Sequence, residues 1–244
     1  MEEEIRPRLK KAQYNEFLTW KKNKALSNER RVLVIGDTHE PFCLDGYLDF
    51  CVKIRDKYHC NTIIHIGDVV DHHYSSFHDT DPDGFSGGDE LDLTIHKLKA
   101  WREEFPKLTW IKGNHVAIIE RKAFSGGLSR RAVRPLPEIY EVPEWNLKES
   151  YELDDVLYQH GIGKKANARI KTDMISTVQG HHHTEANITY AVGAKFKVWG
   201  FQVGCGIDKN AYAMAYGKHF QKPSIGCGVI LENGRLPILE MMEL

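Results

Sequence analysis

Short apolar runs that end in glycine and a polar residue are the main pattern of this sequence. Three of them, rich in β-branched residues, predict buried strands. They are residues 32–35, 62–66 and 108–111, which lead to Gly36-Asp37, Gly67-Asp68 and Gly113-Asn114. Two later runs, residues 156–158 and 175–178, lead to His160-Gly161 and Gly180-His181. Because ligands of open α/β sheets bind where the carboxyl ends of strands converge, we expect these five loops to meet, each turning at its glycine.

Apolar residues at helical spacing separate the first predicted strands. From Tyr47 to Tyr58 they follow the i, i+4, i+7, i+11 pattern, and Asp45 precedes them as a candidate cap. Residues 91–105 carry a second apolar stripe, which Pro106 ends. A helix between two strands makes a β-α-β unit, so we expect parallel neighbouring strands.

The last third of the chain is dominated by strand patterns. Residues 187–192, 195–203, 224–231 and 236–239 are rich in β-branched, aromatic and other apolar residues. Asn233-Gly234 predicts a two-residue hairpin between the last two of these runs. The proline-rich residues 135–143 predict a connection with little regular structure. The expected fold class is α/β, with two mixed β-sheets packed as a sandwich and flanked by helices.

Residues 1–30 predict a helical N-terminal extension of a domain formed by residues 31–244. The extension is basic, with nine Lys or Arg against two Glu between Arg6 and Arg31. The preferred interpretation is a solvated helix that packs on the domain. The alternative is a contact with nucleic acid, for which the extension offers three aromatic residues that could stack on bases.

Composition and charge are those of an ordinary globular protein. The 244 residues are 41% hydrophobic and 27% charged, and the net charge of −1 argues against a globally basic nucleic-acid-binding protein. No apolar run approaches the roughly 20 residues that span a bilayer, and the acidic start lacks the apolar core of a signal peptide. The five cysteines form no C-x-x-C pair, which favours buried thiols in a reducing compartment. We therefore expect a cytoplasmic protein that does not bind membranes.

Five short motifs that follow the predicted strands resemble those of one family. They are D-x-H at 37–39, G-D-x-x-D at 67–71, G-N-H at 113–115, H-G at 160–161 and G-H-x-H at 180–183. In this order they resemble the calcineurin-like metallophosphoesterases. Two positions depart from the family pattern: Val116 stands where an acidic residue often follows G-N-H, and His72-His73 stands where protein Ser/Thr phosphatases have Arg-Gly. The resemblance implies the sandwich fold, with residues 31–244 as the metallophosphoesterase domain.

The resemblance also implies a site with two divalent metal ions. The ligands would be Asp37, His39 and His183 for one ion, Asn114, His160 and His181 for the other, and Asp68 for both. His115 matches the catalytic histidine of the family, and Asp71 would be the carboxylate that orients its imidazole. A ligand set of Asp, His and an amide oxygen suits Mn²⁺ first, with Fe, Zn²⁺ or Ni²⁺ as alternatives.

The predicted activity is hydrolysis of a phosphate ester by attack of a metal-bridging hydroxide. A phosphodiesterase is preferred, because the missing Arg after Asp71 removes the phosphate-binding residue of the protein phosphatases. The alternatives are a nuclease acting on DNA or RNA and a phosphomonoesterase. A non-catalytic interaction module is a further alternative, against which the complete set of motif residues argues. The expected partner is a phosphate ester, with nucleotides and nucleic acids among the candidates.

Two segments between the motifs leave a choice open. Residues 79–90 fit the calcium-loop pattern D-x-D-x-D-G-x5-E, but Pro82 and Ser86 are unusual in such a loop, so an acidic surface loop is preferred. Residues 120–134 carry five positive charges around Gly126-Gly127, and form either a solvated basic helix or a substrate-facing flap that meets phosphate. Surface or supporting roles are preferred over substrate contact for the remaining histidines of interest: His72, His73, His78 and His182.

Overall fold

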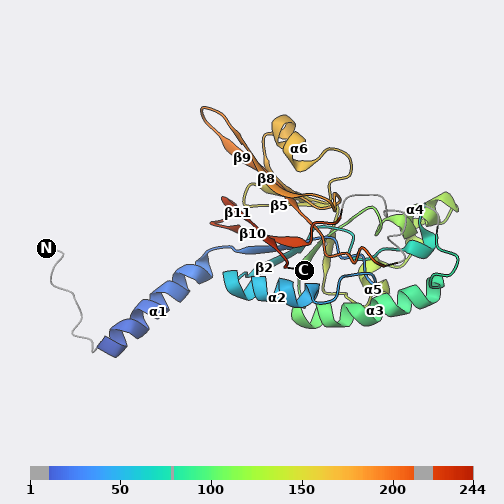
Figure 1. Ribbon diagram of the computed structural model, residues 1–244, viewed down its shortest axis with the longest axis horizontal. Coiled ribbons are helices and arrows are strands. Elements are labelled where there is room, and N and C mark those ends of the chain that lie inside the picture. The colour runs from blue at the N-terminus through green and yellow to red at the C-terminus, as the bar shows by residue number, and fades with distance from the viewer. Residues whose placement is uncertain (1–10, 78–79, 212–221, 244) are drawn as a thin grey trace.

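Two mixed β-sheets lie face to face, with helices on their outer sides, in the computed structural model, which describes residues 11–77, 80–211 and 222–243 (Figure 1). The strands of the first sheet are β1 Val32–Ile35, β2 Thr62–His65, β3 Thr109–Ile111, β4 Asn146–Lys148, β10 Gly226–Leu231 and β11 Leu236–Met241. Those of the second are β5 Ser150–Leu153, β6 Val156–Gln159, β7 Ser176–Gln179, β8 Ala186–Val192 and β9 Lys197–Val203. The helices are α1 Lys11–Asn28, α2 Tyr47–Tyr58, α3 Gly87–Glu104, α4 Ile118–Ser125, α5 Leu136–Ile139 and α6 Ala166–Asp173, with short 3₁₀ turns η1 His73–Ser75 and η2 Arg130–Ala132.

Both sheets combine parallel and antiparallel strands. The first has the order β11-β10-β1-β2-β3-β4, in which β1 to β4 are parallel. The second has the order β5-β6-β7-β9-β8, in which β6, β7 and β9 are parallel. Antiparallel strands complete each sheet. The predicted α/β class with two mixed sheets is confirmed, and so is the parallel pairing of the first strands.

Strand β1 shows why the first strands are unbroken apolar runs. All four of its residues are buried, and successive side chains point to opposite faces of the sheet. Leu33 and Ile35 belong to the core shared with α2 and α3, whereas Val32 and Val34 belong to the core between the two sheets. Because neither face meets solvent, the sequence shows no alternation of apolar and polar residues.

Helix α2 begins where expected but without the expected cap. Gly46 is the residue before the helix and adopts a left-handed conformation with φ of 81°, and no side chain caps the helix. The prediction that Asp45 caps it is therefore wrong; Asp45 is exposed. The predicted apolar stripe does face the core, with Tyr47, Cys51 and Ile54 buried.

Helix α3 begins inside the segment that matched a calcium loop. Ser86 is its N-cap, and the Ser86 hydroxyl accepts a hydrogen bond from the Asp89 amide at 3.2 Å. Glu90, the last residue of the calcium pattern, is buried and accepts hydrogen bonds from the main-chain amides of His73 and Tyr74, at 2.9 and 3.1 Å. The carboxylate that would complete a calcium site is thus engaged elsewhere, as the preferred interpretation required. Asp79 lies outside the described residues.

The last hairpin has a longer connection than predicted. Leu231 of β10 pairs with Leu236 of β11, and the Arg235 amide donates to the Leu231 carbonyl at 3.1 Å. Four residues therefore form the connection, and the predicted two-residue turn is wrong. Strands β4 and β5 and helix α6 were not predicted from the sequence, and the short α5 lies in the proline-rich connection.

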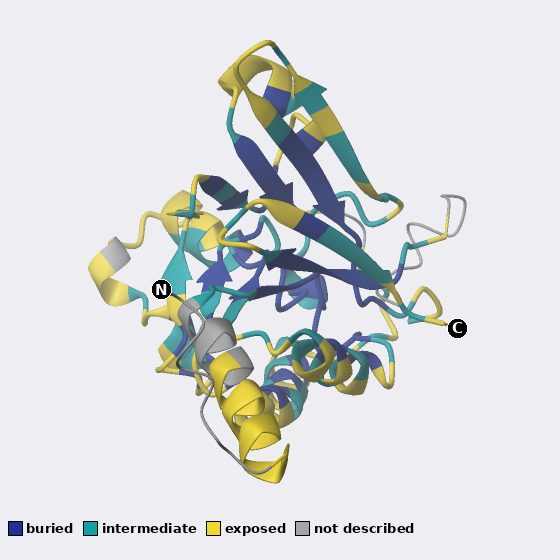
Figure 2. Cartoon of the chain, turned by 90° about the vertical axis from the view of Figure 1, so that its left-hand side faces the viewer, coloured by how far each residue is buried: buried dark blue, intermediate teal, exposed yellow. Residues whose placement is uncertain are grey.

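Helix α1 projects away from the two-sheet body (Figure 1), and Figure 2 shows much of it as exposed. Its side chains from Lys11 to Lys21 are all exposed, so the expected packing of these residues on the domain is wrong. The chain joins the body just after the helix, where Arg30 Nη1 lies 2.8 Å from Asp154 Oδ1. Residues 1–10 lie outside the description. Within the part of the chain that the structure describes, no helix combines the length and apolar character needed to cross a bilayer.

Candidate metal centre

The five motif loops meet at the carboxyl ends of strands from both sheets. β1, β2 and β3 deliver three of them from the first sheet, and β6 and β7 deliver two from the second. The first two loops are joined directly, because the main-chain amides of Thr38 and His39 both donate to the Asp68 carbonyl, at 3.2 and 2.9 Å. The expected convergence is confirmed, and the sandwich adds what one sheet could not, since the ligands approach from two sides.

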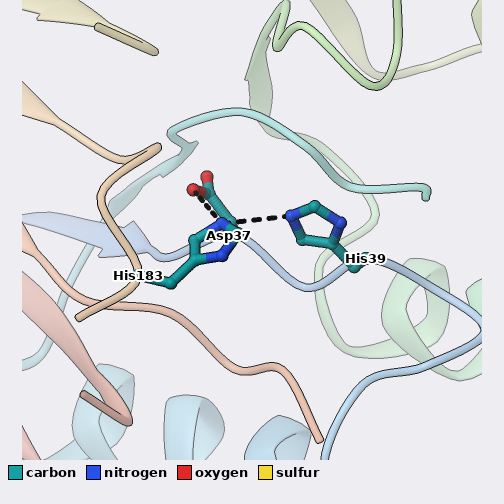
Figure 3. A group of neighbouring side chains, drawn as sticks. All are labelled: Asp37, His39 and His183. Atoms are coloured by element: carbon teal, nitrogen blue, oxygen red, sulfur yellow. Dashed lines mark hydrogen bonds and ion pairs between the residues drawn. The ribbon is translucent and has the colours of Figure 1, made fainter. Parts of the chain in front are cut away.

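Asp37, His39 and His183 form the first group of donor atoms, and Figure 3 shows these three side chains pointing toward one another. His183 Nε2 lies 3.3 Å from Asp37 Oδ2 and 3.2 Å from His39 Nε2. Asp37 and His39 are buried, and His39 adopts a positive φ of 50°. Left-handed backbone at a non-glycine residue is uncommon and gathers at functional sites. This group coincides with the ligands predicted for one ion.

Asp68, His160 and His181 form a second group, and Asn114 adjoins it. His160 Nε2 lies 3.0 Å from Asp68 Oδ2 and 2.9 Å from Asn114 Oδ1. The rings of His160 and His181 are 5.0 Å apart, and His181 has a positive φ of 68°. These are the residues predicted for the other ion.

Asp68 lies between the two groups. Its Oδ2 atom is 3.9 Å from His39 Nε2, in addition to its contact with His160. Its Oδ1 atom accepts a hydrogen bond from the His115 amide at 2.8 Å, which anchors the loop of the third motif. The position matches the bridging role predicted for this carboxylate.

The charge and polarity of the two groups fit metal ions. Burial alone would raise the pKa of Asp68, but the positive charges of His160 and His115 hold it below its usual range. Asp37 Oδ1 and His160 Nδ1 are buried, lie 3.5 Å apart and have no hydrogen-bond partner among the described residues. Buried carboxylates and unpaired imidazole nitrogens need a counter-charge or a coordinating partner. Divalent cations that accept Asp, His and amide ligands satisfy both needs.

Close packing, more than turning, explains the motif glycines. A Cβ atom on Gly67 would lie 2.0 Å from His160 Nδ1, and one on Gly113 would lie 2.0 Å from Asp68 Oδ1. Of these two, Gly67 alone also has a positive φ, of 147°. The glycines were expected to serve sharp turns, whereas their main effect is to let ligand side chains approach the neighbouring loop.

Asp71 contacts two histidines rather than one. His115 Nδ1 lies 3.2 Å from Asp71 Oδ1 and donates to the Asp71 main-chain carbonyl at 2.8 Å. The same Oδ1 atom lies 2.6 Å from His39 Nδ1, a contact that the sequence analysis missed. Burial would lower the pKa of His115, but Asp68 and Asp71 raise it to about 9. Asp71 therefore orients a candidate ligand as well as the candidate catalytic histidine.

His72 and His73 are buried supports for these loops. His72 donates from Nδ1 to the His115 carbonyl at 2.8 Å, and its Nε2 atom contacts the Tyr140 hydroxyl. His73 Nε2 accepts from the Asp81 amide at 3.1 Å. Tyr140 carried no signal in the sequence, because it lies far along the chain in the proline-rich connection. His182 is half-buried beside His181, and His78 lies outside the described residues.

The basic segment after the third motif is helical. α4 covers Ile118–Ser125 and η2 covers Arg130–Ala132, so the interpretation as a basic helix holds for its first half. Arg121 and Lys122 are exposed on α4.

All nine predicted site residues thus lie together, and their assignment to metal ions and catalysis stays a prediction. A family model described as calcineurin-like phosphoesterase matches residues 30–191. No curated protein matches the sequence.

Three solved structures match most of this chain at low sequence identity. Vacuolar Protein Sorting 29 from Cryptosporidium parvum is 13% identical, with a TM-score of 0.45, over 88% of this chain and 92% of that one. The phosphoesterase YfcE from E. coli is 10% identical, with a TM-score of 0.39, over 87% and 100%. The nuclease MPE from Pseudomonas putida is 11% identical, with a TM-score of 0.42, over 85% and 86%.

Proposed function

This chain belongs to the calcineurin-like phosphoesterase family, and from that membership and its site we propose that it is a phosphodiesterase with a dinuclear metal centre. The coarser statement, a metal-dependent phosphoesterase, follows from the family and from the groups of Asp and His side chains. The observation that carries the finer proposal is the arrangement of two ligand groups around one shared carboxylate, that of Asp68.

In this proposal the two groups hold two divalent transition metal ions. Asp37, His39 and His183 would hold one, Asn114, His160 and His181 would hold the other, and Asp68 would serve both. Such a pair activates water at neutral pH and neutralises charge on the phosphoryl oxygens. Mn²⁺ is the first candidate, and Fe, Zn²⁺ and Ni²⁺ suit the same ligands.

His115 is the proposed general acid. The Asp71 carbonyl and carboxylate contact its Nδ1 atom, which would leave Nε2 available to a substrate. The side chain is 14% exposed, so it reaches the surface of the site while Asp71 stays buried. The imidazole would give its proton to the leaving oxygen, which matters most when that oxygen is strongly basic.

A diester suits this site better than a monoester. A phosphate monoester carries a charge of about −1.5 to −2 at neutral pH, whereas a diester carries about −1. The position after Asp71 that would supply an extra cation holds His72, which is buried and engaged with His115 and Tyr140. Burial also lowers the pKa of His72, which disfavours its charged form. With less positive charge near the metals, the less charged substrate is favoured.

The direct test measures metal content and hydrolysis together. We expect purified protein to bind about two metal ions per chain, to lose activity on chelation and to regain it best with Mn²⁺. It should hydrolyse bis(p-nitrophenyl) phosphate faster than p-nitrophenyl phosphate. Asp68→Ala should lose both ions and the activity, whereas Asp45→Ala, which removes an exposed carboxylate, should behave as wild type. Near-normal turnover with two bound ions in Asp68→Ala would show that Asp68 does not bridge them.

We also propose a cytoplasmic location. All five cysteines are free, and Cys43, Cys51, Cys205 and Cys227 are buried. A reducing compartment keeps such thiols unpaired.

A further inference from the structure

An exposed aromatic ring lies against two cationic side chains beside the metal centre. Phe77 is 58% exposed. The guanidinium carbon of Arg121 lies 4.5 Å from the centre of its ring, and Lys122 Nζ lies 5.5 Å from it. Phe124, which lies on helix α4 with Arg121 and Lys122, is 70% exposed.

This cluster is tied to the metal-site loops on both sides. Phe77 lies six residues after Asp71, and Arg121 lies six residues after His115. The main chain from Gly113 to Arg121 is hydrogen-bonded: the Ala117 amide donates to the Gly113 carbonyl, and the Arg121 amide donates to the Ala117 carbonyl, at 3.1 and 3.0 Å. At about 1.5 Å per helical residue, the main chain of Arg121 is on the order of 10 Å from that of His115. The cluster is therefore within reach of a substrate that extends beyond its reacting phosphate.

The charges of the cluster are available for a ligand. Neither Arg121 nor Lys122 forms an ion pair with a carboxylate within residues 11–77, 80–211 and 222–243. The neighbouring Lys112, by contrast, is held by Glu120 and Glu149, at 2.6 and 2.9 Å. A cavity of about 510 Å³ adjoins Arg121. It is lined by Phe124 and other apolar side chains, by the cations Lys112 and Arg134, and by the carboxylates Glu120 and Glu149.

We propose that Phe77, Arg121 and Lys122 form a subsite for single-stranded nucleic acid, with a base stacked on Phe77 and a backbone phosphate bound by the two cations. Stacking platforms with adjacent positive charge are the features that bind single strands without sequence preference. The net charge of −1 means that this attraction is local rather than global. This inference rests on the proposed function, because it makes the substrate of the metal centre an oligonucleotide.

The test measures binding without catalysis. Protein treated with EDTA is titrated into a fluorescein-labelled dodecathymidylate, and fluorescence anisotropy is recorded at several salt concentrations. Because stacking contributes about 1–3 kcal/mol per base, Phe77→Ala should weaken binding by about 5- to 150-fold. Arg121→Ala should reduce the slope of log K against log salt by about 0.7, the value for one phosphate contact with a single strand.

Two matched variants control for the loss of an exposed ring and of a charge. Phe196→Ala removes a ring that is 41% exposed in the turn between β8 and β9, and Arg235→Ala removes an exposed charge between β10 and β11. Both should bind within about twofold of wild type. An abasic oligomer of the same length tests the stacking separately, and it should bind wild type as weakly as the thymidylate binds Phe77→Ala.

The outcomes separate this inference from the proposed function. Equal binding by Phe77→Ala and Phe196→Ala, or equal affinity for the abasic oligomer and the thymidylate, would refute a stacking subsite. Hydrolysis of bis(p-nitrophenyl) phosphate by wild-type protein with Mn²⁺ is measured in parallel. Its absence would refute the proposed function, whatever the binding results.

Discussion

Replacing Gly67 by alanine should destabilise the protein and remove one metal site. The added Cβ would lie 2.0 Å from His160 Nδ1, a distance that no side chain tolerates, so the His160 imidazole must move. In moving it would lose its contacts with Asp68 and Asn114, at 3.0 and 2.9 Å. The variant should therefore bind about one ion instead of two.

The size of the effect has two parts. Alanine at a φ of 147° strains the backbone by about 1–3 kcal/mol. Leaving a buried polar group of His160 without its partner costs roughly a further 1–3 kcal/mol. At about 2–4 °C per kcal/mol for a protein of this size, the melting temperature should fall by roughly 4–24 °C.

Gly163→Ala isolates the first part. Gly163 also has a positive φ, of 98°, but a Cβ there would meet nothing within 4 Å. This variant should lose roughly 2–12 °C through backbone strain and keep both ions. Melting of EDTA-treated protein and elemental analysis of Mn²⁺-loaded protein measure the two effects. If Gly67→Ala keeps two ions and has the same melting temperature as Gly163→Ala, the added Cβ does not displace the His160 imidazole.

Three further predictions concern the proton donor, a buried carboxylate and the projecting helix. His115→Ala should reduce hydrolysis of a nucleotide diester by about 10²–10⁴-fold and that of an aryl diester much less, with metal content unchanged; equal losses would show that His115 does not assist the leaving group. Burial raises the pKa of Glu90 to about 7, so the folded state favours the protonated carboxyl. The resulting contribution to the free energy of unfolding is full below the unfolded pKa near 4.5 and is lost as the pH rises through 7. In urea unfolding, the difference in free energy of unfolding between wild type and Glu90→Gln should accordingly shrink between pH 5 and pH 8. A difference that is constant with pH would contradict the raised pKa of Glu90. Added Ca²⁺ should change the melting temperatures of both proteins equally. Deleting residues 1–28, which leaves the ion pair of Arg30 and Asp154 intact, should change the melting temperature by no more than about 2 °C, and a larger loss would show that the helix packs on the body.

Features of this protein with local signals could be predicted from the amino-acid sequence alone. Strands covered on both faces appear as short apolar runs, and α2 and α3 appear as apolar residues at helical spacing, because each pattern depends only on neighbours along the chain. Polar residues placed directly after those runs indicated which loops meet, since the ends of parallel strands share an edge. Elements with weaker patterns, such as β4, β5 and α6, were missed because their few residues bury only part of their surface.

Which of these residues share a partner depends on how the chain packs in three dimensions. Asp71 contacts His39 as well as His115, and Glu90 turns from an apparent calcium loop to two main-chain amides. Neither contact could be inferred from spacing, because each joins segments 16 or more residues apart whose relative position depends on packing of the whole core. The same holds for Phe77 and Arg121, which are distant in sequence and adjacent in space. Sequence patterns locate strand ends and their side chains, whereas contacts between loops follow from how two sheets and their helices pack together.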